Sequence, residues 1–189
     1  MPTVTHVETR QAQGTTATTS SFAAPAGSLI LVTAAAMNNT ADMPALTITD
    51  SGLKSGSWTP LAAQLNQSSP GQFGASRAWW AASNGATGSI TVSNSVGGSN
   101  SVVAFAVEYV TGTAGIEASS WSSQDISSDP IGAALNVALW SPAVTTDLVS
   151  TLFIWEKSDT AITPGSGWTE TFESTHVTSA AGNGHGSTS

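Results

Sequence analysis

The sequence predicts an all-β domain, an antiparallel β-sandwich with jelly-roll or Greek-key (Ig-like) connections. Two observations predict this fold class. Short apolar runs alternate with turn signals along the 189 residues, and no window shows the 3.6-residue periodicity of a helix. The chain also contains 29 Ser and 26 Thr but only four Lys and Arg together. Thr suits a pleated, half-exposed strand and Ser suits turns, whereas strong helix formers are scarce.

The first half of the chain supplies four expected strands, which cover residues 4–9, 23–37, 44–52 and 57–64. "VTHVET" alternates, and "LILVTAAAM" is an apolar run that follows a Pro-Gly turn. "LTITDSG" alternates apolar residues with Thr and then closes on Asp-Ser-Gly, as expected of a half-buried strand that enters a turn. Pro60 places the return strand at an edge or a bulge. The Thr/Ser-rich stretch 11–21 is either a strand edge or a loop.

The remaining strands are expected at residues 74–83, 89–93, 101–110, 134–140, 147–156 and 164–174. The dipeptide Asn84-Gly85 is a strong turn signal between the first two of these strands. "SVVAFAVEYV" is apolar almost throughout, which predicts a central strand covered on both faces. A long polar stretch over 111–133 is expected to be an exposed loop. The predicted organisation is an N-terminal strand or arm (1–22), a sandwich domain (23–175) and a flexible or partner-ordered tail (176–189).

The charge of the chain excludes several classes of partner. The formal net charge is −8 and the pI is about 4.4, and no basic patch is present, so we expect no nucleic-acid binding. There is no cysteine, no signal peptide pattern and no apolar run of membrane-spanning length. These features predict synthesis in a cytoplasm without membrane insertion. A surface of Ser, Thr, Ala and Gly suits close packing between subunits, although a solvated surface explains the composition equally well.

No catalytic, metal or cofactor site is predicted. His6 and Glu8 would face the same side of a strand and could form a ligand pair or a base with its carboxylate, but a surface pair is far more common. Glu108 is a charge inside an apolar strand, which would be costly if it were buried unpaired. It is a candidate for a glycosidase carboxylate; the favoured alternative is that it lies on the outer face or pairs with Arg77 or Lys157.

The seven tryptophans are numerous beside one tyrosine. In "RAWWAAS", alternation places Arg77 and Trp79 on one face of a strand and Trp80 on the other, between two alanines. We therefore expect Trp80 in the core and Trp79, with Arg77, in a contact surface. Trp121 lies in the small, polar stretch "ASSWSSQ" and is expected to be a loop tryptophan. An exposed tryptophan anchors an interface or supports a sugar ring. The candidate interface or ligand contacts are thus Trp79, Arg77 and Trp121.

Several motifs in order resemble a broad group of β-sandwich proteins that occur as phage virion structural proteins and as bacterial extracellular modules. These motifs are "PAGSLILVTAAA", "LTITDSG" with Trp58, "RAWWAASNGATGSITVS", "VVAFAVEYVTG" and "TTDLVSTLFIWEKS" with "TPGSGWTE". The similarity covers about Ala23 to Glu173. Similar chains continue into a last apolar strand, which this sequence does not show.

The resemblance implies a structural component of a bacteriophage virion, either a capsid decoration protein or a minor tail protein. The expected partners are other copies of the chain, forming a trimer or a larger ring, and virion proteins such as the major capsid or tail proteins. The alternative is a carbohydrate-binding or adhesin-type module that binds a host glycan, because tryptophan is abundant. An enzyme, a hydrolase using Glu108 or Glu8, is the least favoured class.

Overall fold

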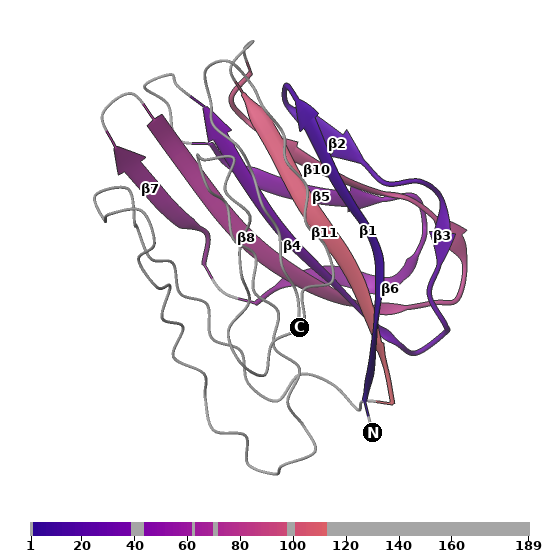
Figure 1. Ribbon diagram of the computed structural model, residues 1–189. Helices are drawn as coiled ribbons and strands as arrows, with labels where there is room; N and C mark the ends of the chain where they lie inside the picture. The colour runs from indigo at the N-terminus through magenta and orange to yellow at the C-terminus, as the bar shows by residue number, and fades with distance from the viewer. Residues whose placement is uncertain (1, 39–43, 62, 70–71, 98–100, 113–189) are drawn as a thin grey trace, which may run out of the picture.

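The computed structural model describes residues 2–38, 44–61, 63–69, 72–97 and 101–112 (Figure 1). Every regular element in these ranges is a strand, which confirms the predicted all-β class. The strands are β1 (Thr3–Gln13), β2 (Thr16–Thr18), β3 (Phe22–Ala23), β4 (Leu29–Asn38), β5 (Leu46–Asp50), β6 (Lys54–Pro60), β7 (Leu65–Ser69), β8 (Gln72–Ser83), β9 (Thr87–Gly88), β10 (Ile90–Asn94) and β11 (Val102–Thr111).

The strands form two antiparallel sheets that pack against each other, and a short third pair. The large sheet has the order β1-β11-β4-β8-β6, and β7 also pairs with β8. The small sheet has the order β2-β10-β5, and β3 pairs with β9. Figure 1 shows β1, β11, β4 and β8 side by side as one twisted layer, with β2, β10 and β5 in the other. The prediction of an antiparallel sandwich is confirmed, and the choice between jelly-roll and Greek-key connections stays a prediction.

The hydrophobic core lies between the two sheets. The large sheet contributes alternate side chains that are almost fully buried, among them Ile30, Val32, Val103, Phe105 and Val107. The small sheet contributes Leu46 from β5, Ile90 and Val92 from β10, and Ala17 from β2. Alternation along each strand produces this arrangement, because successive side chains point to opposite faces of a sheet.

Strand β11 is the most buried strand in the described ranges. It lies between β1 and β4, and all of its residues from Val102 to Glu108 are buried. The expected central strand, covered on both faces, is therefore confirmed. Its second face, which points away from the small sheet, carries Val102, Ala104, Ala106, Glu108 and Val110, each at most 4% exposed.

Two parts of the strand pattern go beyond the prediction. No strand was predicted at β7, whose sequence "LNQSS" lacks an apolar alternation; pairing with β8 holds it in the sheet. The Thr/Ser-rich stretch 11–21, predicted as either a strand edge or a loop, contains the strand β2, which pairs with β10. In both cases hydrogen bonds to a distant strand decide the conformation, and the local sequence does not carry that information.

The remaining predictions lie outside the described residues. They are the loop over most of 111–133, the strands at 134–140, 147–156 and 164–174, the tail 176–189, and Trp121. The boundaries of the predicted arm and domain stay predictions. Strand β1, which belongs to the predicted arm, is paired along its length with the central strand β11.

Candidate functional site

The two adjacent tryptophans of β8 occupy the opposite faces from those predicted. Trp79 is 3% exposed and belongs to the core between the sheets, where it pairs across the strands with Val32. Trp80 is half-buried on the other face, opposite Leu31. The prediction of Trp79 as an exposed contact residue is therefore wrong. Both faces of "RAWWAAS" are apolar enough to be buried, so alternation alone does not distinguish them, and the register with β4 does.

Arg77 faces the same side as Trp79, toward the interior of the sandwich. Its guanidinium carbon lies 5.4 Å from the centroid of the Trp79 ring, a cation–π contact. Its Nη1 donates a hydrogen bond to the carbonyl oxygen of Leu46 at 3.3 Å. Arg77 thus reaches from β8 in the large sheet to β5 in the small sheet. We interpret it as a link between the two layers, because its guanidinium contacts both Trp79 of the large sheet and the backbone of Leu46 in the small sheet.

The pair formed by His6 and Glu8 is separated by a β-bulge. The register of β1 against β11 shifts between these residues, so that His6 lies opposite Glu108 and Glu8 lies opposite Val107. The inserted residue, Val7, packs against the core. Because neighbouring residues of β11 point to opposite faces, His6 and Glu8 do so as well, and the expectation of a shared face is wrong. No joint ligand or acid–base role of these two side chains follows.

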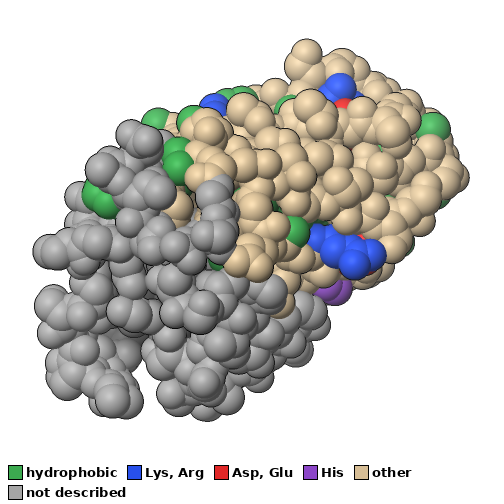
Figure 2. All heavy atoms as spheres, turned by 90° about the horizontal axis from the view of Figure 1, so that it is seen from above, with side chains coloured by type: hydrophobic (Ala, Val, Ile, Leu, Met, Phe, Trp, Pro, Cys, Tyr) green, Lys and Arg blue, Asp and Glu red, His purple; other side chains and the backbone are tan. Residues whose placement is uncertain are grey.

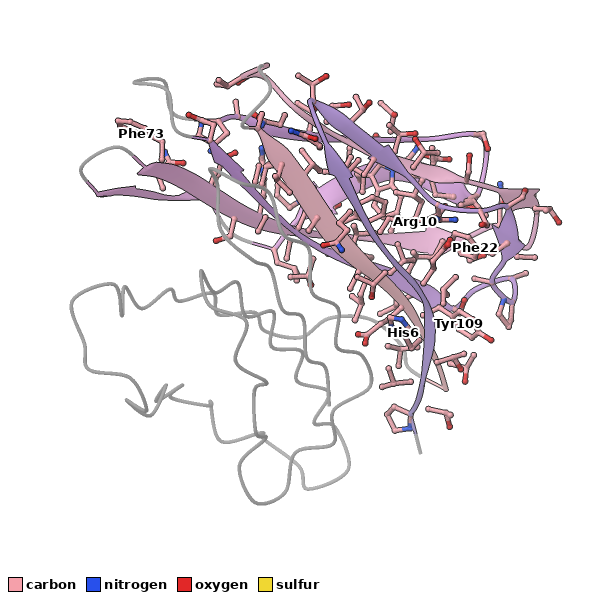
Figure 3. The ribbon with its side chains drawn as sticks, turned by 45° about the horizontal axis from the view of Figure 1, so that its top comes forward. His6, Arg10, Phe22, Phe73 and Tyr109 are labelled. Atoms are coloured by element: carbon pink, nitrogen blue, oxygen red, sulfur yellow. The ribbon has the colours of Figure 1, made fainter. Side chains whose placement is uncertain are left out.

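Glu108 lies on the face of the large sheet that points away from the small sheet, the side that one of its favoured alternatives gave it, but its side chain is buried there, with 2% exposed. Its Oε1 is 3.9 Å from Nδ1 of His6, whose side chain is 22% exposed. The Nε2 atom of His6 in turn lies 3.4 Å from the hydroxyl of Thr9. Arg77 lies on the opposite face and is not its partner. Figure 3 shows His6 on β1 close to the lower end of the strand, apart from Arg10 on the same strand.

Glu8 and Arg10 form a second group on the other side of β1. The Nη2 atom of Arg10 lies 2.6 Å from Oε1 of Glu8 and donates to the hydroxyl of Ser20 at 2.7 Å. The backbone N–H of Ser20 donates to Oε2 of Glu8 at 2.7 Å. These bonds tie β1 to the segment that follows β2. They use both oxygens of the carboxylate in structural contacts, which leaves no geometry that resembles a catalytic acid or nucleophile.

Asp50 organises the turn after β5, in the "TITDSG" motif. Its Oδ1 accepts the N–H groups of Gly52 at 2.8 Å and Leu53 at 2.9 Å, and its Oδ2 accepts Nε1 of Trp58 at 3.0 Å. Nζ of Lys54 lies 3.2 Å from the same Oδ2. Burial of Asp50 by itself raises the pKa of its carboxyl, but these four hydrogen-bonding partners outweigh burial and hold the pKa below its ordinary value. The motif is therefore a structural turn.

The described residues carry as many cationic as anionic side chains. The carboxylates are Glu8, Asp50 and Glu108, and the cations are Arg10, Lys54 and Arg77. Among them no group of three or more His, Cys, Asp or Glu could hold a metal ion. The same ranges contain no helix long and apolar enough to cross a membrane. Figure 2 shows a face on which charged side chains are few, and Lys or Arg side chains lie beside Asp or Glu.

The outer face of the small sheet consists of hydroxyl side chains. Each of its three strands has an apolar residue facing the core between two hydroxyl residues facing outward: Ala17 in β2, Ile48 in β5 and Val92 in β10. We call the outward-facing set the hydroxyl face; its members are Thr16, Thr18, Thr47, Thr49, Thr91 and Ser93. The four residues on the outer strands β2 and β5 are exposed and the two on β10 are half-buried. None of these residues is among those predicted from the sequence, although the three segments share a hydroxyl–apolar–hydroxyl pattern.

Comparisons with protein-family models, with curated proteins and with solved structures give no match for this chain.

Proposed function

We propose that this protein is a structural component of a bacteriophage virion, a capsid decoration or minor tail protein that acts through packing between subunits. The observation that carries the proposal is the way the described residues handle charge. Arg10 pairs with Glu8 and Lys54 pairs with Asp50, while the exposed sheet surface is built from Ser and Thr. A neutral surface of short side chains loses little solvation and little side-chain entropy on packing, which suits a subunit of an assembly.

The ionisable groups also favour a structural role over an enzymatic one. Glu8 and Asp50 are each occupied by several hydrogen bonds that hold neighbouring segments in place. The remaining carboxylate, Glu108, lies on a different face of the large sheet from Glu8. A glycosidase needs two carboxylates across one cleft, and these two do not share a side of the sheet. The described carboxylates therefore supply no support for hydrolysis.

One of the tryptophans on which the glycan-binding alternative depended, Trp79, does not favour it. Sugar rings stack on exposed aromatic side chains, and Trp79 is in the core. Within the described ranges Val4 is the one large hydrophobic side chain that is exposed, and Trp80 is half-buried. The alternative now depends on Trp80 and on Trp121, which lies outside these ranges.

Immunoelectron microscopy tests the proposal. An antibody raised against the full chain is applied to purified particles from the source culture, with an antibody against an unrelated soluble protein as the control. A virion subunit predicts repeated labelling at fixed positions on the capsid or the tail. Protein that remains unassembled, with no label on any particle, would refute the proposed role.

A further inference from the structure

The second face of the large sheet, which points away from the small sheet, is buried along three adjacent strands. The buried side chains are Val102, Ala104, Ala106, Glu108 and Val110 on β11, Leu29, Thr33 and Ala35 on β4, and Ala78 on β8. Each of them is at most 8% exposed. In the described part of the chain the small sheet packs on the other face of the large sheet, and no strand lies over this one. Burial of this degree requires a further layer of protein.

The side chains at the centre of the second face are small. Ala106 of β11 lies opposite Thr33 of β4, which in turn lies opposite Ala78 of β8, and Ala104 lies opposite Ala35 in the next row. Two layers pack closely when small residues on one layer face large residues on the other. The layer over this centre is therefore expected to contribute large apolar side chains.

The position of the chain after β11 favours a layer from the same molecule. The stretches outside the described residues have at most five residues each, apart from 113–189. That stretch begins directly after β11, the central strand of the second face. Gly112 at the junction has a φ of +73°, a conformation in which glycine lets the chain change direction sharply. A segment attached in this way has an effective concentration of about 1 mM or more at the face, which a separate partner would have to exceed.

Within 113–189 the segment 147–156, "DLVSTLFIWE", matches the second face in length and in side-chain size. Six of its ten residues are large and apolar. Extended, it spans about 33 Å, enough to cross the face along β11 from Val102 to Val110, which is about 27 Å. The segment 134–140 is shorter, at about 23 Å. The segment 164–174 has two large apolar residues, Trp168 and Phe172.

Charge complementarity favours the same segment. Among the described residues Glu108 is the one carboxylate on the second face, and its Oε1 lies 3.9 Å from Nδ1 of His6. Lys157 is the one Lys or Arg in 113–189, and it directly follows the segment 147–156. A buried carboxylate is stabilised by opposite charge nearby. The segment therefore combines an apolar stretch for the centre of the face with a cation for the end at which Glu108 lies.

We propose that the segment 147–156 of the same chain docks on the second face of the large sheet, with its C-terminal end toward Glu108. The large sheet then lies between two layers, with the small sheet on one side and this segment on the other. A strand covered on both faces is apolar almost throughout, and β11 has this character. The contact lies within one chain, so it does not depend on the proposed virion role.

Photo-crosslinking of the full chain tests the proposal. The photoreactive residue p-benzoylphenylalanine replaces Trp80, which is half-buried on the second face, and cross-linked peptides are identified by mass spectrometry. The expected product is a cross-link within one chain to residues 147–157. The same probe at Leu31, opposite Trp80 in the register, is a second position for the case in which the Trp80 variant does not fold. The control is the probe at Thr91 on the hydroxyl face, which is expected to give no such cross-link.

The products distinguish the possible occupants of the face. A cross-link that joins two chains would overturn the proposal and assign the face to a second copy. Cross-links to other parts of the same chain, or no cross-link from a folded variant, would overturn the choice of 147–156.

Thiol reactivity gives an independent measurement. Leu152→Asp and Phe153→Asp are introduced together, so that a charge enters whichever side of the segment faces the sheet. A reporter Ala106→Cys on the second face is expected to react at least tenfold faster in this background, whereas a reporter Ala34→Cys on the core face is expected to stay slow. The matched control places the two aspartates at 187 and 188, with no expected change. An unchanged rate at Ala106→Cys, or an equal increase at Ala34→Cys, would contradict docking of this segment.

Discussion

Truncation of the two adjacent tryptophans to alanine is the sharpest test of the structure, because Trp79 and Trp80 differ in the face they occupy and in little else. Trp79 is 3% exposed and belongs to the core cluster, together with residues of the small sheet. A buried tryptophan removes about 150–250 Å² from water, worth about 4–6 kcal/mol as an upper bound at about 25 cal/mol per Å². Measured truncations of buried aromatic residues cost about 3–5 kcal/mol. Trp79→Ala also removes the cation–π contact with Arg77, about 0.5–1 kcal/mol.

Trp80 is half-buried, so Trp80→Ala is expected to cost about 1.5–2.5 kcal/mol, half of the value for a buried aromatic residue. The measurement is urea unfolding followed by far-ultraviolet circular dichroism, which does not depend on tryptophan emission. The expected result is a lower midpoint for Trp79→Ala than for Trp80→Ala, with equal slopes. Equal losses, or a larger loss for Trp80→Ala, would refute the assignment of the two faces.

Three further predictions concern the turns and the buried face of the large sheet. The pKa of the Asp50 carboxyl is lowered in the folded protein, so the stability that Asp50 contributes is present above the ordinary pKa of about 3.9 and is lost as the pH falls through the lowered pKa. In a series of urea unfolding midpoints measured against pH, Asp50→Asn should therefore reduce the decrease in stability over this acidic range. Gly85 has φ of +82° and a Cβ there would lie 3.0 Å from Cβ of Ala26, so Gly85→Ala should lower the free energy of unfolding by about 1–2 kcal/mol or more; a neutral result in urea unfolding would contradict this geometry. The chain has no cysteine, so a single introduced thiol reports the burial of its position. A thiol reagent should modify Thr47→Cys rapidly, because Thr47 is exposed, and Ala106→Cys only on unfolding, because Ala106 is buried. Equal rates for the two variants would show that the face of the large sheet that carries Ala106 is open to solvent.

The fold class and the individual turns could be predicted from the sequence because they depend on local patterns. Alternation in "LTITD" and the Asp-Ser-Gly that follows indicated a half-buried strand and a turn, and the structure shows Asp50 accepting the N–H groups that close it. The nearly unbroken apolar run of β11 indicated a central strand, and the strand is buried on both faces. These features depend on consecutive residues, so they can be predicted without knowing which strand pairs with which.

The faces of β1 and β8 could not be predicted, because they depend on pairing. An extra residue at Val7 inverts the side on which every earlier residue of β1 lies, and it separates His6 from Glu8. Alternation in β8 divided the residues into two sets correctly, but only the register with β4 shows which set faces the small sheet. Arg77 was assigned to a surface because it is charged, whereas its side chain links β8 to the backbone of β5.

The sequence by itself therefore determined an all-β, charge-poor chain of antiparallel strands, with its turns at Asp50 and Asn84-Gly85 and its most buried strand at β11. Tertiary structure alone decided which side of each strand is the inside, which carboxylates and cations meet, and that hydroxyl residues from three separate segments line up on one face. The physical reason is the two-residue repeat of a strand: a shift of one residue in pairing exchanges its faces, and pairing is set by segments far apart in the chain.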